Sequence, residues 1–153
     1  EQIGERVYFG MRQKAKEGNG ILGFNIPYGF ESIPNGLEIN KEEAENVKHI
    51  FSFYLEGNTM RGICEELRKK NILTKKGKHN WDPKTVYRIL SNPLYIGYYR
   101  WEDIYYRSDF DPIIDEEIFE RVQERLNKRD NPLKAIRKEL YTDVKNEKFH
   151  EMS

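Results

Sequence analysis

The chain has 153 residues, of which 37% are hydrophobic and 13% aromatic, and its formal net charge is zero, which is enough for one globular domain with a modest core. It contains no run of about 18 apolar residues and no N-terminal signal-peptide pattern, so we expect a cytoplasmic protein with no membrane partner. A single cysteine excludes an internal disulfide, and the three histidines show no metal-ligand spacing.

The first predicted element is a helix over residues 3–17 with a thin apolar stripe at Ile3, Val7 and Met11. A helix this polar is not expected to belong to a core. Because it starts without a cap, we expect residues 1–18 to be the end of a longer linker helix from a missing N-terminal part.

The next segment, GILGFNIPYGF, is rich in glycine, proline and aromatic residues and is predicted to be extended. It leads into a hairpin with residues 29–33 and 37–40 as its arms. The turn is predicted at Pro34-Asn35-Gly36, because an Asn-Gly pair favours a tight hairpin turn.

Two helices are predicted in the centre of the chain. Asn40 caps the first, which runs up to Gly57, since Glu43 stands at the third position as in a capping box and apolar residues recur at helical spacing. Thr59 caps the second. Cys64 falls on the apolar side of this helix, so we interpret it as a buried structural thiol rather than a nucleophile.

A short helix follows a lysine-rich loop. It begins at Asp82-Pro83, an N-cap followed by proline at the first helical position, and is predicted to end near residues 91–93. Trp81 precedes the cap and is expected to pack against the core. The side chains predicted to be buried are Val86, Ile89 and Leu90. The side chains predicted to point outward are Lys84, Thr85, Tyr87 and Arg88.

The last predicted elements are a second hairpin, a helix and a tail. The hairpin has residues 96–101 and 104–107 as arms. Asp115 caps the helix, and residues 130–153 have weak helical character and are expected to be loosely held. The fold class is therefore α+β and mainly α: a helical domain with a helix-turn-helix-like unit and small β-hairpins, preceded by a linker helix. The predicted apolar stripe of the last helix comprises Ile118, Phe119, Val122 and Leu126.

The zero net charge conceals a segregated distribution. Residues 67–88 contain eight lysines and arginines and one acid, Asp82, whereas residues 102–120 contain eight acids and one base, Arg107. Binding responds to the local field rather than to the sum, so the first segment suits a polyanion and the second repels one. The alternative is that the lysines are only a solvated surface.

Residues 59–70 and 82–91 form two short amphipathic helices in succession, the layout of a helix-turn-helix. A major groove admits such a helix, and lysines in flanking loops neutralise phosphates. The linker of about ten residues is longer than the usual three or four. Two further hypotheses stay open: a free-standing helix-turn-helix transcription regulator, and a protein-interaction module that docks through the acidic face at 102–120.

Three stretches are more specific than this layout: YGF, then GLEINKEEAENVKHIFSFYLEGNTMRGICEELRKKNI, then KKGKHNWDPKTVYRILSNPLYIGYYRW. In this order they resemble the recombinase domain of large serine recombinases, the family of phage integrases and conjugative-transposon resolvases. The resemblance runs from Glu5 to Arg129 and rests on several independent motifs.

The resemblance implies a sequence-specific DNA-binding module of a bacterial or phage recombinase that integrates or excises a mobile element at attachment sites. In this family a catalytic-serine domain precedes the recombinase domain and a zinc ribbon follows it. We therefore expect a linker helix at 1–18, the DNA-binding domain at 19–129, and a segment toward the zinc ribbon at 130–153. The chain is expected to hold no catalytic residue and to be inactive alone, with zinc and self-association belonging to the missing domains.

Physical reasoning and the resemblance predict the same partner, duplex DNA. The linker helix can follow the DNA backbone, the glycine-rich strand after it can follow the minor groove, and the helix from Asp82 can enter the major groove. Tyr28 on that strand is at least as well suited to packing. The candidate contacts of the linker and strand are Arg12, Lys14, Lys16, Asn19, Asn25 and Tyr28. The candidate contacts of the flexible loop are Lys75, Lys76, Lys78 and His79, and those of the helix are Lys84, Thr85, Tyr87 and Arg88.

Overall fold

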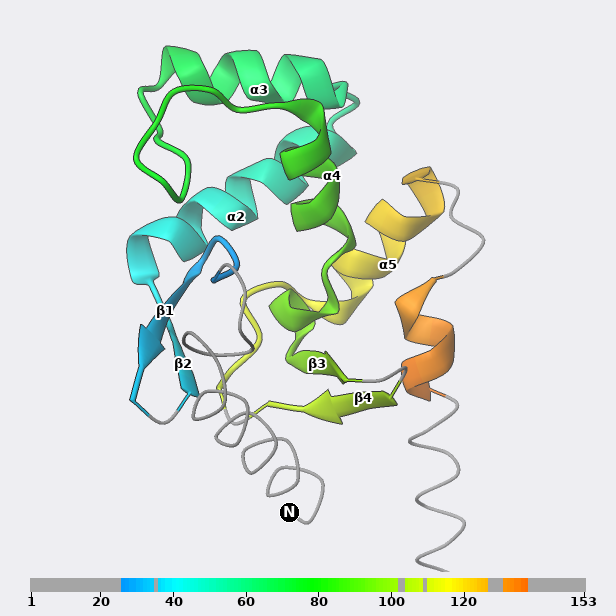
Figure 1. Ribbon diagram of the computed structural model, residues 1–153. Coiled ribbons are helices and arrows are strands. Elements are labelled where there is room, and N and C mark those ends of the chain that lie inside the picture. The colour runs from blue at the N-terminus through cyan, green and yellow to red at the C-terminus, as the bar shows by residue number, and fades with distance from the viewer. Residues whose placement is uncertain (1–25, 35, 102–103, 109, 127–130, 138–153) are drawn as a thin grey trace, which may run out of the picture.

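The computed structural model describes residues 26–34, 36–101, 104–108, 110–126 and 131–137. Helices predominate, accompanied by two small antiparallel hairpins (Figure 1), which confirms the predicted fold class. Within the described ranges, no helix is long and apolar enough to cross a membrane. The elements are β1 (Phe30–Ile33), β2 (Gly36–Ile39), α2 (Lys41–Leu55), α3 (Met60–Lys69), α4 (Pro83–Ser91), the 3-10 helix η2 (Pro93–Ile96), β3 (Tyr98–Trp101), β4 (Ile104–Arg107) and α5 (Glu116–Leu126).

Local capping explains why three of the helices begin where they do. Asn40 and Thr59 each accept a hydrogen bond at 3.0 Å from the backbone N–H three residues later, which starts α2 and α3. Asp82 accepts two, from the N–H groups of Lys84 at 2.7 Å and Thr85 at 3.1 Å, and Pro83 stands at the first helical position of α4. These starts confirm the predictions.

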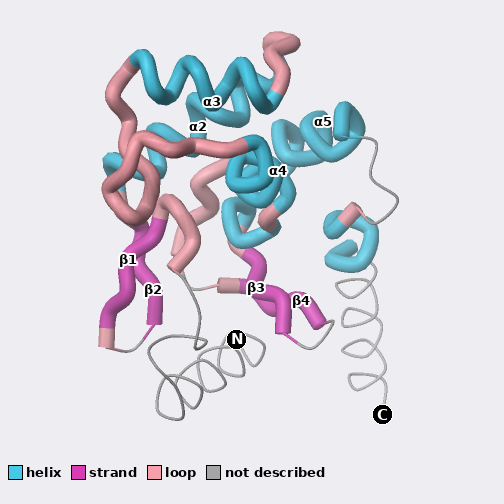
Figure 2. The backbone as a smooth tube through the Cα atoms, turned by 45° about the horizontal axis from the view of Figure 1, so that its top comes forward, coloured by secondary structure: helices cyan, strands magenta, loops and turns pink. Residues whose placement is uncertain are grey.

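One hydrophobic core joins these elements, and α2 lies at its centre, in contact with α3, α4 and α5. Figure 2 shows the four helices gathered on one side of the molecule and both hairpins on the other. Cys64 on α3 is buried, as expected for a structural thiol. Burial raises the pKa of this thiol, which disfavours the reactive thiolate. The largest fully buried side chains include Phe30, Phe51, Trp81, Tyr95 and Phe119.

The two hairpins differ from the predictions at their ends. In the first, Ile33 pairs with Gly36, so Gly36 belongs to the second strand and not to the turn. In the second, β3 begins only at Tyr98, because Asn92 accepts a hydrogen bond from the N–H of Leu94 at 3.0 Å and starts the 3-10 helix η2 instead. Local capping at a proline therefore prevails over strand propensity in this segment.

Helix α5 buries a different face from the one predicted. Asp115 starts it as expected, accepting a hydrogen bond from the N–H of Glu117 at 2.9 Å. Phe119 and Val122 are buried, but Ile118 is 39% exposed and Gln123 takes its place on the buried side. The prediction for Ile118 is wrong because the side of α5 that packs against α2 and α4 is centred on Phe119, Val122 and Gln123, whose amide donates to the Leu90 carbonyl of α4.

The chain after α5 contributes to the core. Residues 131–137 include a helical turn, and its Leu133 and Ile136 are fully or almost fully buried. Arg137 binds both carboxylate oxygens of Glu120 on α5 at 3.1 Å, and this hydrogen bonding lowers the pKa of that carboxyl. The expectation of a loosely held tail from residue 130 is therefore wrong for residues 131–137, while residues 138–153 lie outside the described part.

Candidate nucleic-acid interface

Helix α4 presents two cations on an outer face while its inner face is anchored. Val86 and Leu90 are completely buried in the core, and Ile89 nearly so. Lys84 and Arg88 are exposed on the other side and stand four residues apart, which places them on one helical face. Neither forms an ion pair with any residue that the structure describes. Two strong hydrogen-bond donors are thus held outward on a fixed helix.

The other two residues predicted on this face differ in exposure. Tyr87 is 39% exposed, so its ring contributes to the outer surface. Thr85 is half-buried, whereas Lys84 and Arg88 are exposed. The described geometry therefore favours Lys84, Tyr87 and Arg88 over Thr85 as the outward set.

The start of α4 is tied to the end of α3. Trp81 is almost fully buried, donates its indole N–H to the Ile72 carbonyl at 2.7 Å, and packs edge-on against Tyr28 with ring centroids 5.2 Å apart. Arg68 on α3 donates to the Trp81 carbonyl. The prediction that Trp81 packs is confirmed. Tyr28 packs as well: it is buried, and its hydroxyl accepts a hydrogen bond from Asn46 at 3.0 Å.

The segment between α3 and α4, residues 73–80 and hereafter the basic loop, is closed by its own hydrogen bonds. The Thr74 N–H donates to the Lys78 carbonyl at 2.8 Å, the Gly77 N–H donates to the Thr74 carbonyl at 2.9 Å, and the Lys78 N–H donates to the Thr74 hydroxyl at 3.1 Å. Gly77 has φ +73°, a left-handed conformation that glycine adopts at little cost. The loop is therefore an internally bonded turn, which differs from the flexible loop that the sequence predicts.

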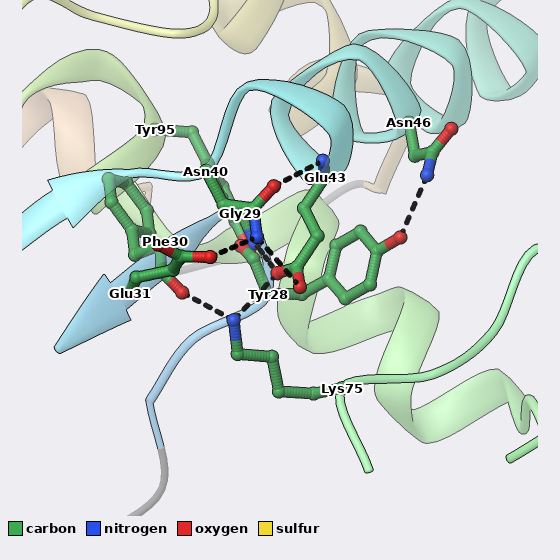
Figure 3. Close-up of polar contacts among 9 residues, drawn as sticks. All are labelled: Tyr28, Gly29, Phe30, Glu31, Asn40, Glu43, Asn46, Lys75 and Tyr95. Atoms are coloured by element: carbon green, nitrogen blue, oxygen red, sulfur yellow. Dashed lines mark hydrogen bonds and ion pairs between the residues drawn. The ribbon is translucent and has the colours of Figure 1, made fainter. Parts of the chain in front are cut away.

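Within the basic loop, Lys75 behaves differently from its neighbours. Its ammonium lies 2.8 Å from a carboxylate oxygen of Glu43 on α2 and also donates to the Phe30 carbonyl on β1 (Figure 3). Lys76, Lys78 and His79 are exposed, and none of them forms an ion pair within the described part of the chain. The charge of Lys75 thus has a protein partner, whereas the charges of Lys76 and Lys78 have none among the described residues.

The Glu43 contact corrects the predicted capping box. The Asn40 N–H, which a capping-box Glu43 would bind, donates to the Gly29 carbonyl at 2.9 Å instead. The Glu43 carboxylate accepts the Gly29 N–H at 2.8 Å and the Asn40 side-chain amide at 3.4 Å (Figure 3). Pairing across the first hairpin satisfies the Asn40 N–H and frees Glu43 for Lys75, and nothing in the local sequence signals this arrangement.

The structure brings some of the predicted contacts together and leaves others undescribed. The Lys75 contacts hold the basic loop against α2 and the first hairpin, while Lys84 and Arg88 follow on α4, after the buried Trp81. The predicted contacts outside the described residues are Arg12, Lys14, Lys16, Asn19 and Asn25.

The acidic segment is partly neutralised within the protein. Glu120 and Glu116 pair with Arg137, and Glu117 pairs with Arg121 on α5 at 3.1 Å. Among the described residues no group of three or more histidine, cysteine or acidic side chains could hold a metal ion. The alternative docking surface therefore has less free charge than its sequence indicates.

The chain is similar to a protein family and to solved structures. A family model described as Recombinase matches residues 41–129, which span α2 to α5. A crystal structure of an LSR–DNA complex is 26% identical, with a TM-score of 0.59 over 80% of this chain and 39% of that one. A structure from a study of the sequence requirements of the Listeria innocua prophage attP site is 29% identical, with a TM-score of 0.57 over 65% of this chain and 41% of that one. The chain thus spans about two fifths of the length of the solved chains that it matches.

Proposed function

The chain belongs to the Recombinase family, the DNA-binding domain of large serine recombinases, and we propose on that basis that it binds duplex DNA sequence-specifically at attachment sites. The bound sites would be those at which a site-specific recombinase integrates or excises a mobile element. The proposal assigns DNA cleavage, zinc binding and self-association to other domains of a full recombinase. It assigns residues 1–18 to a linker helix and residues 130–153 to the path toward a zinc ribbon.

The observation that carries the proposal is the outer face of α4. A helix whose opposite side is locked into a core can be inserted into a major groove without rearranging, and its outward side chains then reach base edges. Arg88 can donate two parallel hydrogen bonds to guanine, and Lys84 can bind a base edge or a phosphate. These two residues are the proposed readers, with Tyr87 beside them.

The basic loop supplies the second part of the proposed interface. Lys76 and Lys78 carry charge without a carboxylate partner in the described structure and are proposed to bind phosphates, with His79 next to them. Phosphate contacts add affinity and carry little sequence information. Four such cations, counting Lys84 and Arg88, would weaken binding about 150-fold between 50 and 200 mM salt.

The test is binding of the 153-residue chain to duplex DNA, measured by fluorescence anisotropy across a salt series. Because the attachment site is unknown, the probe is a duplex enriched from a random-sequence library by the wild-type chain, compared with a scrambled duplex. The double variant Lys84→Ala/Arg88→Ala is expected to lose the preference for the enriched duplex. It should also flatten the salt slope by up to about 1.8 log units per log unit, if both residues contact phosphate.

A matched control removes two exposed cations from elsewhere on the surface. Lys48→Ala/Arg121→Ala also removes two positive charges, so it changes the net charge equally. Lys48 and Arg121 lie on α2 and α5, in exposed pairs with Glu45 and Glu117. If the two double variants bind alike, α4 is not the reading helix. If the wild-type chain binds no duplex at 50 mM salt, the proposal fails and the protein-interaction hypothesis gains.

A further inference from the structure

We infer that Lys75 is a positioning residue, which together with Glu43 anchors the basic loop against the first hairpin and does not itself contact DNA. The inference rests on the proposed function for its DNA part, because it concerns how the loop that carries Lys76 and Lys78 is held. Within one run of lysines, Lys75 then positions the loop, while Lys76 and Lys78 contact the DNA.

The contacts of the Lys75 ammonium are those of a structural group. It donates to the Glu43 carboxylate at 2.8 Å and to the Phe30 carbonyl, so two of its three donors are used inside the protein. The side chain of Lys75 is 31% exposed and that of Glu43 is 20% exposed. A pair this shielded from water is screened less by salt than a surface pair, and moving the ammonium to a phosphate would leave the Glu43 charge half-buried without its partner.

These contacts link the basic loop to two other elements. Glu43 belongs to α2 and also accepts the Gly29 N–H, while Phe30 opens β1 (Figure 3). Lys75 therefore joins the loop to the helix and to the hairpin through the same carboxylate. The two ends of the loop are joined by the hydrogen bond from the Trp81 indole to the Ile72 carbonyl, and its interior by the hydrogen bond from the Lys78 N–H to the Thr74 hydroxyl. Lys75 adds the contact that fixes the orientation of the loop relative to β1.

The anchor matters for binding because an ordered loop presents its charges in place. A loop that must be ordered when DNA arrives loses conformational entropy at that moment, whereas a loop that is already held has lost it during folding. Ordering the backbone of one residue on binding weakens association by about 5- to 30-fold. Loss of the anchor should therefore reduce affinity by this factor without removing a phosphate contact.

The sign of the Glu43 effect separates anchoring from direct contact. If Lys75 bound a phosphate, Glu43 would compete for its charge and repel the DNA, so removing the carboxylate would tighten binding. If Lys75 anchors the loop, removing the carboxylate weakens binding, as removing the lysine does. Electrostatics alone cannot make the loss of a negative charge weaken binding to DNA.

The first arm of the experiment needs no DNA. Hydrogen exchange of the Gly77 and Lys78 amides is measured in the wild-type chain and in Lys75→Met, Glu43→Met and the double variant, with Lys75→Arg as the conservative replacement. Both single variants should raise exchange at these amides, the double variant should raise it by less than the sum of the two effects, and Lys75→Arg should restore protection. Lys76→Met, the adjacent exposed lysine, is the control and should leave exchange unchanged. Unchanged exchange in Lys75→Met and Glu43→Met would overturn the anchor.

The second arm measures binding of the same variants to the enriched duplex across the salt series. Lys75→Met and Glu43→Met should each lower affinity about 5- to 30-fold with the salt slope unchanged, whereas Lys76→Met should flatten the slope by about 0.9. A slope flattened by about 0.9 in Lys75→Met, with tighter binding in Glu43→Met, would show that Lys75 contacts phosphate and overturn the inference. If the wild-type chain binds no DNA, the proposed function fails and the DNA part of the inference with it, while the exchange arm still decides the anchor.

Discussion

Replacing Gln123 with glutamate tests how α5 holds the end of α4. Gln123 is 2% exposed, and its amide donates to the Leu90 carbonyl at 2.7 Å, in the last turn of α4 where carbonyls lack intrahelical donors. Its side-chain oxygen is buried and has no hydrogen-bond partner in the described structure. Gln123→Glu keeps the shape and exchanges this donor for a carboxyl, which can donate to Leu90 only while it is protonated.

The cost of Gln123→Glu should depend on pH in a defined direction. Burial beside a carbonyl raises the pKa of the introduced carboxyl above its unfolded value of about 4.3. Below that pH it is protonated in both states and stability is retained. As pH rises the unfolded state releases its proton first, so stability falls until pH passes the folded pKa and then stays level. A shift of about 2 units, modest for a buried group, costs about 2.7 kcal/mol at pH 8.

The assay is urea unfolding followed by circular dichroism at pH 4.5 and pH 8. The stability difference between wild type and Gln123→Glu should be small at pH 4.5 and about 2.7 kcal/mol at pH 8. Glu124→Gln, an exposed neighbour on the same helix, is the control and should stay within about 0.5 kcal/mol at both pH values. An equal difference at both pH values would mean that residue 123 reaches water and does not bridge α5 to Leu90.

Two further predictions concern other tertiary contacts. Arg125 donates to carbonyls in and just after the last turn of α2, including that of Asn58 at 3.0 Å, and its guanidinium lies 4.0 Å from the Tyr54 ring centroid. Arg125→Ala should therefore lower the unfolding free energy, measured by urea titration, by about 1–2 kcal/mol. A change as small as that of Arg121→Ala would contradict this capping role. Cys64 is buried with a raised pKa, so iodoacetamide at pH 8 should alkylate it much more slowly in the folded chain than in urea, whereas equal rates would show that the thiol is accessible.

Local sequence determined where most of the helices begin and which of their faces are apolar. The caps at Asn40, Thr59 and Asp82 and the buried side of α4 follow from interactions between residues three or four positions apart, which any window of the sequence contains. The segregation of charge is also visible in the sequence, because lysines that are close in sequence remain close in the folded chain. Motifs in a fixed order were also enough to predict the family that residues 41–129 match.

Tertiary structure alone decided which polar side chains hold the fold and which face outward. Lys75 and Lys76 are adjacent and chemically identical, yet within the described residues only Lys75 contacts a carboxylate, from a residue 32 positions away in sequence. Gln123 is buried in place of Ile118, because α4 offers a carbonyl there. Such outcomes depend on partners brought together by folding, and desolvation makes an unpaired buried group costly enough for those partners to determine the orientation. A single sequence displays the charges but not the distances between them.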